Sequence, residues 1–234
     1  MGSGARRSSA ALWVGGGTRL VVALTCIGVL LFGGAGTFSW ARGWLFLGVL
    51  GATLAFNLSF LIRINPVLLE ERWKRRSDTK PFDRVFGALY FLATLLMLGT
   101  AGMDSVRWQW THMPETLLYA GLALHFAGMV PVLAALLANP HLETTVRIQT
   151  DRDHRVISTG PYRYVRHPMY VGLILLFLGW PLLLGSWVAA AFGFAVAVLL
   201  IVRTALEDRT LRAELAGYRA FCDQTRYRLL PGVW

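Results

Sequence analysis

Long apolar runs separated by polar breaks of different length dominate this chain. The runs span residues 20–38, 44–62, 85–103, 116–138 and 168–202. About 20 apolar residues in a helix cross the hydrocarbon core of a bilayer, so each of the first four runs predicts one transmembrane helix. The fifth run is too long for one crossing and is broken between Pro181 and Ser186, which favours two short helices joined by a tight turn. The pattern predicts an all-α, polytopic membrane helix bundle with about six transmembrane helices.

Composition supports a membrane protein. The chain of 234 residues is 55% hydrophobic and 15% charged, with a mean hydropathy of +0.51, which is too apolar for an ordinary soluble domain. A net charge of +10 would suggest nucleic acid as a partner of a soluble protein, but here the basic residues form blocks between apolar runs. Membrane topology explains these blocks better, so we expect membrane lipids and no nucleic acid as partners.

The positions of the basic residues predict the orientation in the membrane. Of the 23 Lys and Arg residues, only Arg42 and Arg107 fall in the turns after the first and third predicted helices. By the positive-inside rule, both termini and both long loops are therefore expected to be cytoplasmic. We divide the chain into a mobile tail (1–17), an N-terminal unit of transmembrane helices with a cytoplasmic loop (18–153) and a C-terminal core (154–234).

The first long loop, residues 63–84, contains the string N-P-V-L-L-E-E-R-W-K-R-R. Glu70 with Lys74 and Glu71 with Arg75 are spaced as i,i+4 pairs, which predicts a short helix on the membrane surface. The sequence assigns no chemical role to this string.

Residues 158–172 read S-T-G-P-Y-R-Y-V-R-H-P-M-Y-V-G, a polar, cationic and aromatic stretch that passes directly into an apolar run. Pro161 and Pro168 bias the residues before them away from helix, and Pro168 suits the first turn of the helix that follows. Such a helix start, beside Arg166 and His167, has free backbone N–H groups that can hold an anion. By composition alone, the stretch is more typical of an interfacial anchor, and the exact string is what favours a functional site.

The C-terminal segment follows the last apolar run and predicts an amphipathic cytoplasmic helix. On a continuous helix its apolar stripe is formed by Leu211, Leu215, Tyr218 and Cys222. Glu207 lies one turn before this stripe and Arg203 one turn before Glu207, so both charges are predicted to point inward near the membrane boundary. Charges at this depth are expensive unless paired, so the two residues form either a structural ion pair or part of a functional site.

Together these strings resemble the isoprenylcysteine carboxyl methyltransferase family of integral-membrane enzymes. The resemblance rests on G-P-Y-R-Y-V-R-H-P-M-Y-V-G with His154 upstream, and on R-x-x-x-E-D-x-x-L followed by Tyr218 and R-Y-R-L-L-P-G-V-W. The family pattern has a second Glu where this chain has Asp208. The resemblance is strongest from about His154 to Trp234, and it implies S-adenosylmethionine as cofactor.

The resemblance also implies roles for single residues. Arg203 and Glu207 are the expected catalytic residues, with Arg203 orienting an acceptor carboxylate in two-point contact. Glu207 or Asp208 is expected to accept from the cofactor's ammonium group, and which of the two does so stays open. The full set expected to bind the cofactor is His154, Gly160, Tyr162, Arg166, His167, Pro168, Tyr170, Glu207 and Asp208.

The acceptor is expected to be lipophilic, either a small molecule or a prenylated group, and most plausibly a carboxylate. Methyl transfer to a carboxylate needs no general base, whereas an amine or thiol acceptor would need one, with His154 as the candidate. Metal binding is not expected, because the His, Asp and Glu residues of 141–154 match no ligand spacing.

Two alternatives remain. A string R-H-P-x-Y-x-G and a Tyr…R-x-x-P ending also resemble NADPH-dependent sterol-reductase-like membrane oxidoreductases. A membrane scaffold or transporter without enzymatic activity would use the basic loops to bind anionic lipids.

Overall fold

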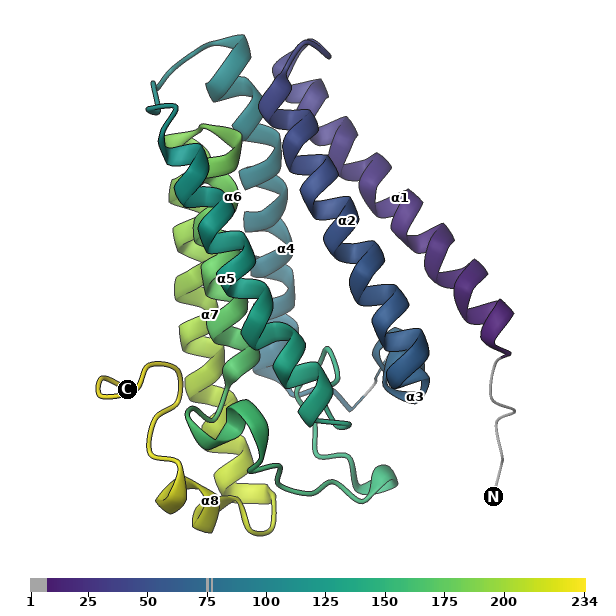
Figure 1. The fold of residues 1–234 in the computed structure, drawn as a ribbon. Helices are drawn as coiled ribbons and strands as arrows, with labels where there is room; N and C mark the ends of the chain where they lie inside the picture. The colour runs from purple at the N-terminus through teal and green to yellow at the C-terminus, as the bar shows by residue number, and fades with distance from the viewer. Residues whose placement is uncertain (1–7, 75, 77) are drawn as a thin grey trace.

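The chain forms a bundle of long helices with short helices and loops gathered at one end (Figure 1). The computed structural model describes residues 8–74, 76 and 78–234. Its long helices are α1 (Ser9–Ala35), α2 (Ala41–Ile64), α4 (Pro81–Gly102), α5 (Leu117–Ala138), α6 (Pro168–Leu184) and α7 (Trp187–Glu214). Its short helical segments are α3 (Pro66–Trp73), the π-helical turn η1 (Met103–Arg107), the 3₁₀ turns η2 (Thr150–Arg152) and η3 (Gly160–Arg163), and α8 (Tyr218–Gln224). The predicted all-α class is confirmed.

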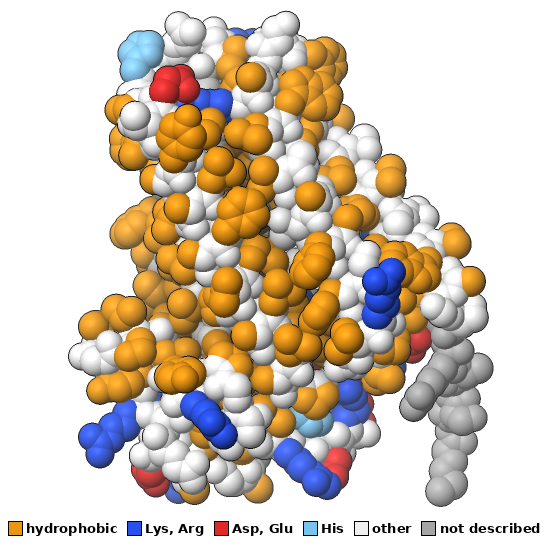
Figure 2. Space-filling model, in the orientation of Figure 1, with side chains coloured by type: hydrophobic (Ala, Val, Ile, Leu, Met, Phe, Trp, Pro, Cys, Tyr) orange, Lys and Arg blue, Asp and Glu red, His pale blue; other side chains and the backbone are white. Residues whose placement is uncertain are grey.

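Five helices are long and apolar enough to span a membrane: α1, α2, α4 extended through η1, α5 and α7. Helix α6 is equally apolar but shorter, with 17 residues. The expected division of residues 168–202 into two helices is confirmed, because the chain turns at Gly185, whose φ of +77° suits a residue without a side chain. Apolar side chains cover the flanks of the bundle, and charged ones gather toward its ends (Figure 2).

The predicted N-terminal tail is wrong for residues 9–17, which belong to α1; residues 1–7 lie outside the described residues. The Ser8 side chain caps the helix by accepting from the amide of Ala11. The glycines at 15–17 lower the intrinsic helix propensity, but Gly16 packs directly against Leu58 of α2, where a β-carbon would lie 2.6 Å from a leucine methyl. Tertiary contact therefore stabilises a segment that local propensity does not.

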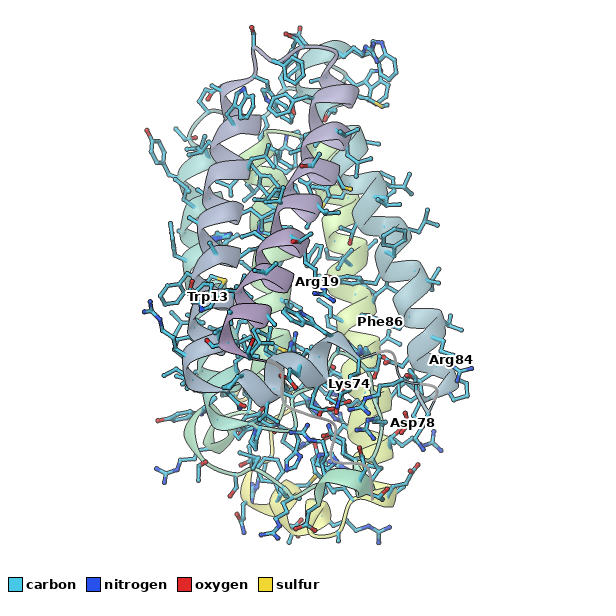
Figure 3. All side chains as sticks on the ribbon, turned by 90° about the vertical axis from the view of Figure 1, so that its right-hand side faces the viewer. Trp13, Arg19, Lys74, Asp78, Arg84 and Phe86 are labelled. Carbon is cyan, nitrogen blue, oxygen red and sulfur yellow. The ribbon has the colours of Figure 1, made fainter. Side chains whose placement is uncertain are left out.

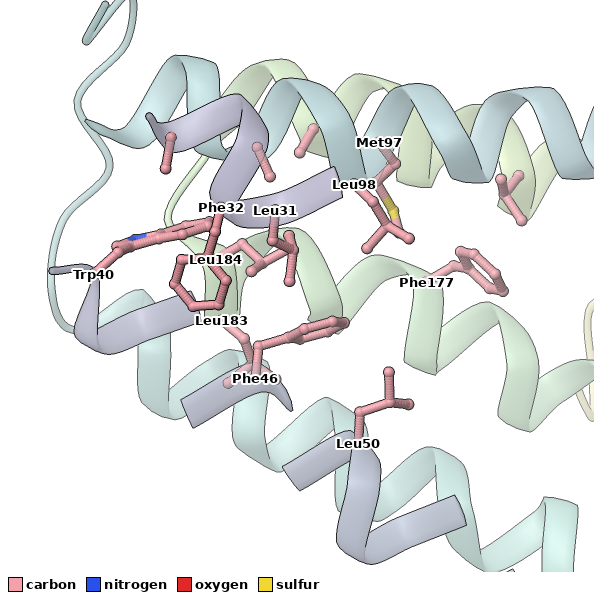
Figure 4. Close-up of a cluster of buried hydrophobic side chains, with 14 of the residues drawn as sticks. Leu31, Phe32, Trp40, Phe46, Leu50, Met97, Leu98, Phe177, Leu183 and Leu184 are labelled. Atoms are coloured by element: carbon pink, nitrogen blue, oxygen red, sulfur yellow. The ribbon is translucent and has the colours of Figure 1, made fainter. Parts of the chain in front are cut away.

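The helices pack through an apolar core, part of which is drawn in Figure 4. Leu31, Phe46, Phe177 and Leu183 are almost completely buried there. Helices α2, α5 and α6 meet at His125.

The ring of His125 joins these helices by hydrogen bonds. Trp180 donates to Nδ1 at 3.1 Å, and Thr53 lies 2.9 Å from Nε2. Because an indole N–H can only donate, Nδ1 accepts and Nε2 carries the proton toward Thr53.

Helices α5 and α6 approach each other closely at Gly128 and Gly172. A β-carbon on Gly172 would lie 2.4 Å from the carbonyl oxygen of Gly128, and one on Gly128 would lie 2.7 Å from that of Gly172. Small residues are what allow membrane helices to come this near. The contact fixes the position of α6 along α5, and therefore also the position of the loop that precedes Pro168.

We call the end of the bundle that holds α3, α8 and the segments 139–167 and 225–234 the polar end. Charged side chains crowd there in Figure 3. The predicted continuous C-terminal helix is wrong, because α7 ends at Glu214 and the chain turns at Gly217, with φ of +81°, before α8 begins at Tyr218. A helix cannot readily continue through a left-handed residue.

Candidate functional site

A cavity lies at the polar end between segment 139–157, the start of α6 and the end of α7. With its open mouth it encloses about 790 Å³. Most of the residues that the sequence indicated line it, namely His154, Tyr162, Arg166, His167, Pro168, Tyr170, Arg203 and Glu207. Gly160 and Asp208 do not belong to its lining.

Gly160 and Tyr162 shape the wall near the end of α5. Gly160 has φ of +60° and packs against Ala138, so it allows the chain to turn tightly into η3. The hydroxyl of Tyr162 accepts from Asn139 at 3.0 Å, and burial is the main reason why its pKa is raised. This tyrosine is therefore neutral and presents its ring to the cavity.

The loop before α6 lies along the C-terminal segment. The amide of Arg166 donates to the carbonyl of Tyr227 at 2.9 Å, and the amide of His167 donates to that of Arg228 at 3.0 Å. These two bonds place the sequence R-Y-R-L-L-P-G-V-W beside R-H-P, which explains physically why the two strings occur together.

Asp208 is the centre of a buried ionic cluster. Its carboxylate lies 2.7 Å from Arg166, 2.9 Å from Arg228 and 3.1 Å from Arg212, and it accepts from the hydroxyl of Tyr218 at 3.0 Å. The side chain of Asp208 is fully buried. A carboxylate with this many protein donors joins α7, α8 and the loop before α6, and has little capacity left for a ligand.

Arg166 is equally occupied. Besides Asp208, its guanidinium donates to the carbonyls of Thr225 and Arg226 at 2.8 and 2.6 Å. Its side chain touches the cavity wall, but its donors hold the loop in place rather than pointing at open space.

Glu207 differs from its neighbour Asp208. It lines the cavity with its side chain 20% exposed, and it accepts from the hydroxyl of Tyr170. Its other charged neighbour is His167, whose Nδ1 lies 3.9 Å away and whose ring stacks on Tyr170. In the described part of the chain, no Lys or Arg side chain forms an ion pair with Glu207.

Arg203 faces the same cavity but pairs with a residue that the sequence did not indicate. Its Nε lies 2.8 Å from Oδ1 of Asp83 on α4, and its Nη2 donates to the carbonyl of Thr144 at 2.9 Å. The guanidinium also lies 4.5 Å from the ring centre of Phe86 and 5.3 Å from that of Tyr170. The open question of an Arg203–Glu207 pair is thereby answered, because the partner of Arg203 is Asp83.

Segment 139–152 is held over the cavity by an ionic network. Glu143 accepts from Arg147 at 2.9 Å and from Arg76 at 2.9 Å, and Arg147 also bonds Asp151 and Asp78. Burial alone would raise the pKa of Glu143, but the hydrogen bonds and charges of the two arginines outweigh it and lower the pKa. Glu143 is therefore ionised and part of the structure. Among the described residues, no group of three or more His, Cys, Asp or Glu side chains is arranged to hold a metal ion.

His141 and His154 form a pair at the other end of the cavity, with ring centres 4.9 Å apart. Burial, together with the charges of His141 and Arg147, lowers the pKa of His154 to about 4, and burial also lowers that of His141. Both rings are therefore neutral at pH 7. Nδ1 of His141 is buried and has no hydrogen-bond partner within the described ranges.

Helix α3 gives the string N-P-V-L-L-E-E-R a structural role. The side chain of Asn65 caps the helix, Pro66 occupies its first turn, and Leu68 is fully buried. Arg72 donates to the carbonyl of Leu142 at 2.7 Å, so α3 holds one edge of segment 139–152. Of the i,i+4 pairs expected here, Lys74 pairs with Glu71 in place of Glu70, and Arg75, the expected partner of Glu71, lies outside the described residues.

The fold and the site define a multi-pass helical membrane protein with a polar, ionisable cavity at one end of its bundle. Residues 122–213 match the model of the isoprenylcysteine carboxyl methyltransferase (ICMT) family. Over 44 residues the chain is 43% identical to a protein-S-isoprenylcysteine O-methyltransferase of Schizosaccharomyces pombe. That match covers 19% of this chain and 19% of the relative.

A solved structure of the eukaryotic intramembrane Ras methyltransferase ICMT is similar with a TM-score of 0.46 and 16% identity. The similarity covers 92% of this chain and 75% of that one. The family-model match over residues 122–213 agrees with the resemblance that the motifs carry. The matched residues include the loop before α6, Arg203 and Glu207.

Proposed function

We propose that this chain is an integral-membrane methyltransferase that moves the methyl group of S-adenosylmethionine to the carboxylate of a lipophilic, isoprenylcysteine-like acceptor. The observation that carries the proposal is Glu207. It is a carboxylate on the cavity wall that receives a hydroxyl from Tyr170 but pairs with no Lys or Arg of the described chain. A carboxylate beside a membrane is expensive without a cation, so this position favours a cationic ligand.

The residues present fit S-adenosylmethionine. Glu207 would accept from the ammonium group, while His167 and the amide of Met169 in the first turn of α6 would hold the methionyl carboxylate. The neutral rings of His141 and His154, with Tyr162 nearby, offer hydrogen-bonding edges and a flat surface suited to adenosine.

When bound, S-adenosylmethionine supplies an electrophilic methyl group on a sulfonium. The chain's own residues then have to position an acceptor carboxylate in line with that methyl and exclude water. Arg203 would orient the carboxylate, and the ring of Tyr170, between Arg203 and Glu207, would face the sulfonium. No side chain has to remove a proton from an ionised acceptor.

The acceptor is taken to be lipophilic because the cavity adjoins apolar, membrane-length helices. By the distribution of Lys and Arg, the polar end and both termini would be cytoplasmic. A carboxylate on a lipid-like chain would then reach Arg203 from the inner leaflet.

Calorimetric titration of the detergent-purified protein with S-adenosylhomocysteine, with NADPH in parallel, tests the proposal. We expect S-adenosylhomocysteine alone to bind. Glu207→Gln should weaken this binding at least tenfold, because a charge-assisted hydrogen bond contributes about 1.5–3 kcal/mol. Binding of NADPH alone, or of neither ligand, would reject the methyltransferase assignment.

A further inference from the structure

Asp83 is a buried carboxylate in the first turn of α4, at the polar end. Pro81 occupies the first position of this helix, and the side chain of Asp83 is 2% exposed. A buried carboxylate at a membrane boundary needs partners, and Asp83 has them on two other parts of the fold.

One carboxylate oxygen of Asp83 holds segment 139–152. Oδ2 accepts from the amide of Val146 at 2.8 Å, while the amide of Lys80 donates back to the carbonyl of Val146 at 3.2 Å. This segment carries the wall of the cavity from His141 to Arg147. Oδ2 of Asp83 therefore joins α4 to segment 139–152, which lines the cavity.

The other oxygen faces Arg203. Oδ1 lies 2.8 Å from Nε, yet no hydrogen bond joins these two buried atoms. The contact is an ion pair that aligns the guanidinium by charge. Phe86, which lies between α4 and α7 in Figure 3, supports the guanidinium from one face, and Tyr170 supports it from another side.

The remaining nitrogens show which edge of Arg203 is available. Nη2 donates to the carbonyl of Thr144 at 2.9 Å, whereas Nη1 has no protein acceptor among the described residues. Arg203 lines the cavity, on the same helix and one turn from Glu207. An orientation set by Asp83 and Thr144 thus leaves Nη1 for a ligand.

We propose that Asp83 is a positioning residue for methyl transfer: it holds Arg203 so that Nη1 faces the acceptor carboxylate, and it couples this orientation to the position of segment 139–152. The inference rests on the function proposed above. Asp83 itself touches neither cofactor nor acceptor in this scheme, so its effect passes through Arg203.

The variant Asp83→Asn removes the charge of this side chain and keeps its shape. The amide retains an oxygen for Val146 but loses the charge that aligns Arg203. We expect turnover of N-acetyl-S-farnesylcysteine at saturating S-adenosylmethionine to fall by about 10- to 100-fold, the size expected for a misplaced orienting group. The Kd of the folded variant for S-adenosylhomocysteine should stay within twofold, although the loss of a buried charge also lowers its unfolding midpoint.

Asp78→Asn is the matched control. Asp78 lies 3.2 Å from Arg147 at the edge of the same network, but its side chain is 54% exposed, so turnover should stay within twofold. Asp83→Glu keeps the charge and should retain more turnover than Asp83→Asn. It therefore also provides the test where the Asn variant does not fold.

A double variant tests whether the effect of Asp83 on turnover passes through Arg203. In an Arg203→Lys background the planar two-edge contact is gone, so adding Asp83→Asn should change turnover less than threefold. A full tenfold loss in that background, or an equal loss of S-adenosylhomocysteine affinity in Asp83→Asn, would overturn the role assigned to Asp83. If the unaltered chain does not bind S-adenosylhomocysteine at all, the proposed function fails instead, which is a separate outcome.

Discussion

Replacing Asp208 by Asn should destabilise the protein strongly without removing a cofactor contact. The carboxylate is fully buried and bonds Arg166, whose side chain is 2% exposed, as well as Arg228 and Tyr218. Breaking a buried ion pair from one side costs about 3–5 kcal/mol, because the other charge stays buried and uncompensated. For a chain of 234 residues, this corresponds to a fall of roughly 6–20 °C in the unfolding midpoint.

The assay is thermal unfolding in detergent, followed by intrinsic tryptophan fluorescence, with and without S-adenosylhomocysteine. Glu207→Gln is the matched control, since it is the same kind of change one residue away on α7. That variant should unfold within about 2 °C of the parent, but the ligand should no longer raise its midpoint. Asp208→Asn should unfold much earlier, and the ligand should still stabilise the fraction that is folded.

The reverse pattern would refute this division of roles. If Asp208→Asn kept the parent midpoint and lost the ligand response, Asp208 would be the cofactor's carboxylate and the ionic cluster would be secondary.

Three further outcomes follow. Gly128→Ala should lower the unfolding midpoint by several degrees, because its β-carbon meets a backbone oxygen, whereas Gly87→Ala should not, since nothing lies within 4 Å. The folded pKa of His154 is about 4, below its unfolded value of about 6.5, so its contribution to stability is present above pH 6.5 and lost as the pH falls toward 4. His154→Asn should therefore flatten the dependence of the unfolding free energy on pH in a denaturation series. Arg72→Ala should free segment 139–152 and increase its amide hydrogen exchange, because the bond to Leu142 is lost.

Local patterns were sufficient to predict most of the fold. Apolar runs of membrane length located the long helices, and i,i+4 spacing on α7 placed Arg203 and Glu207 on one face toward the interior. Both signals depend only on neighbours within a helix. The error at residues 9–17 has the same origin, because the contact of Gly16 with Leu58 joins two helices and leaves no trace in local propensity.

Which acid does what could not be predicted, because Glu207 and Asp208 are adjacent and differ only in the direction they face. The partners that separate them, Arg166, Arg228 and Tyr170, come from other parts of the chain. Asp83 was missed although a signal existed. Asp83 is a carboxylate at the start of an apolar run. An ionisable residue at membrane depth indicates a functional site, and the same argument drew attention to Arg203.

Each carboxylate described here at the cavity has an arginine partner within the described chain, with the exception of Glu207. Asp208 is paired with arginines, Glu143 with Arg147 and Arg76, and Asp83 with Arg203, so these ion pairs contribute rigidity. What remains is the carboxylate of Glu207, with no arginine or lysine partner in the described chain, and the free Nη1 of Arg203. A cationic group bound at the first and an anionic group bound at the second would lie on either side of Tyr170, which is the arrangement that a reaction between a sulfonium and a carboxylate requires.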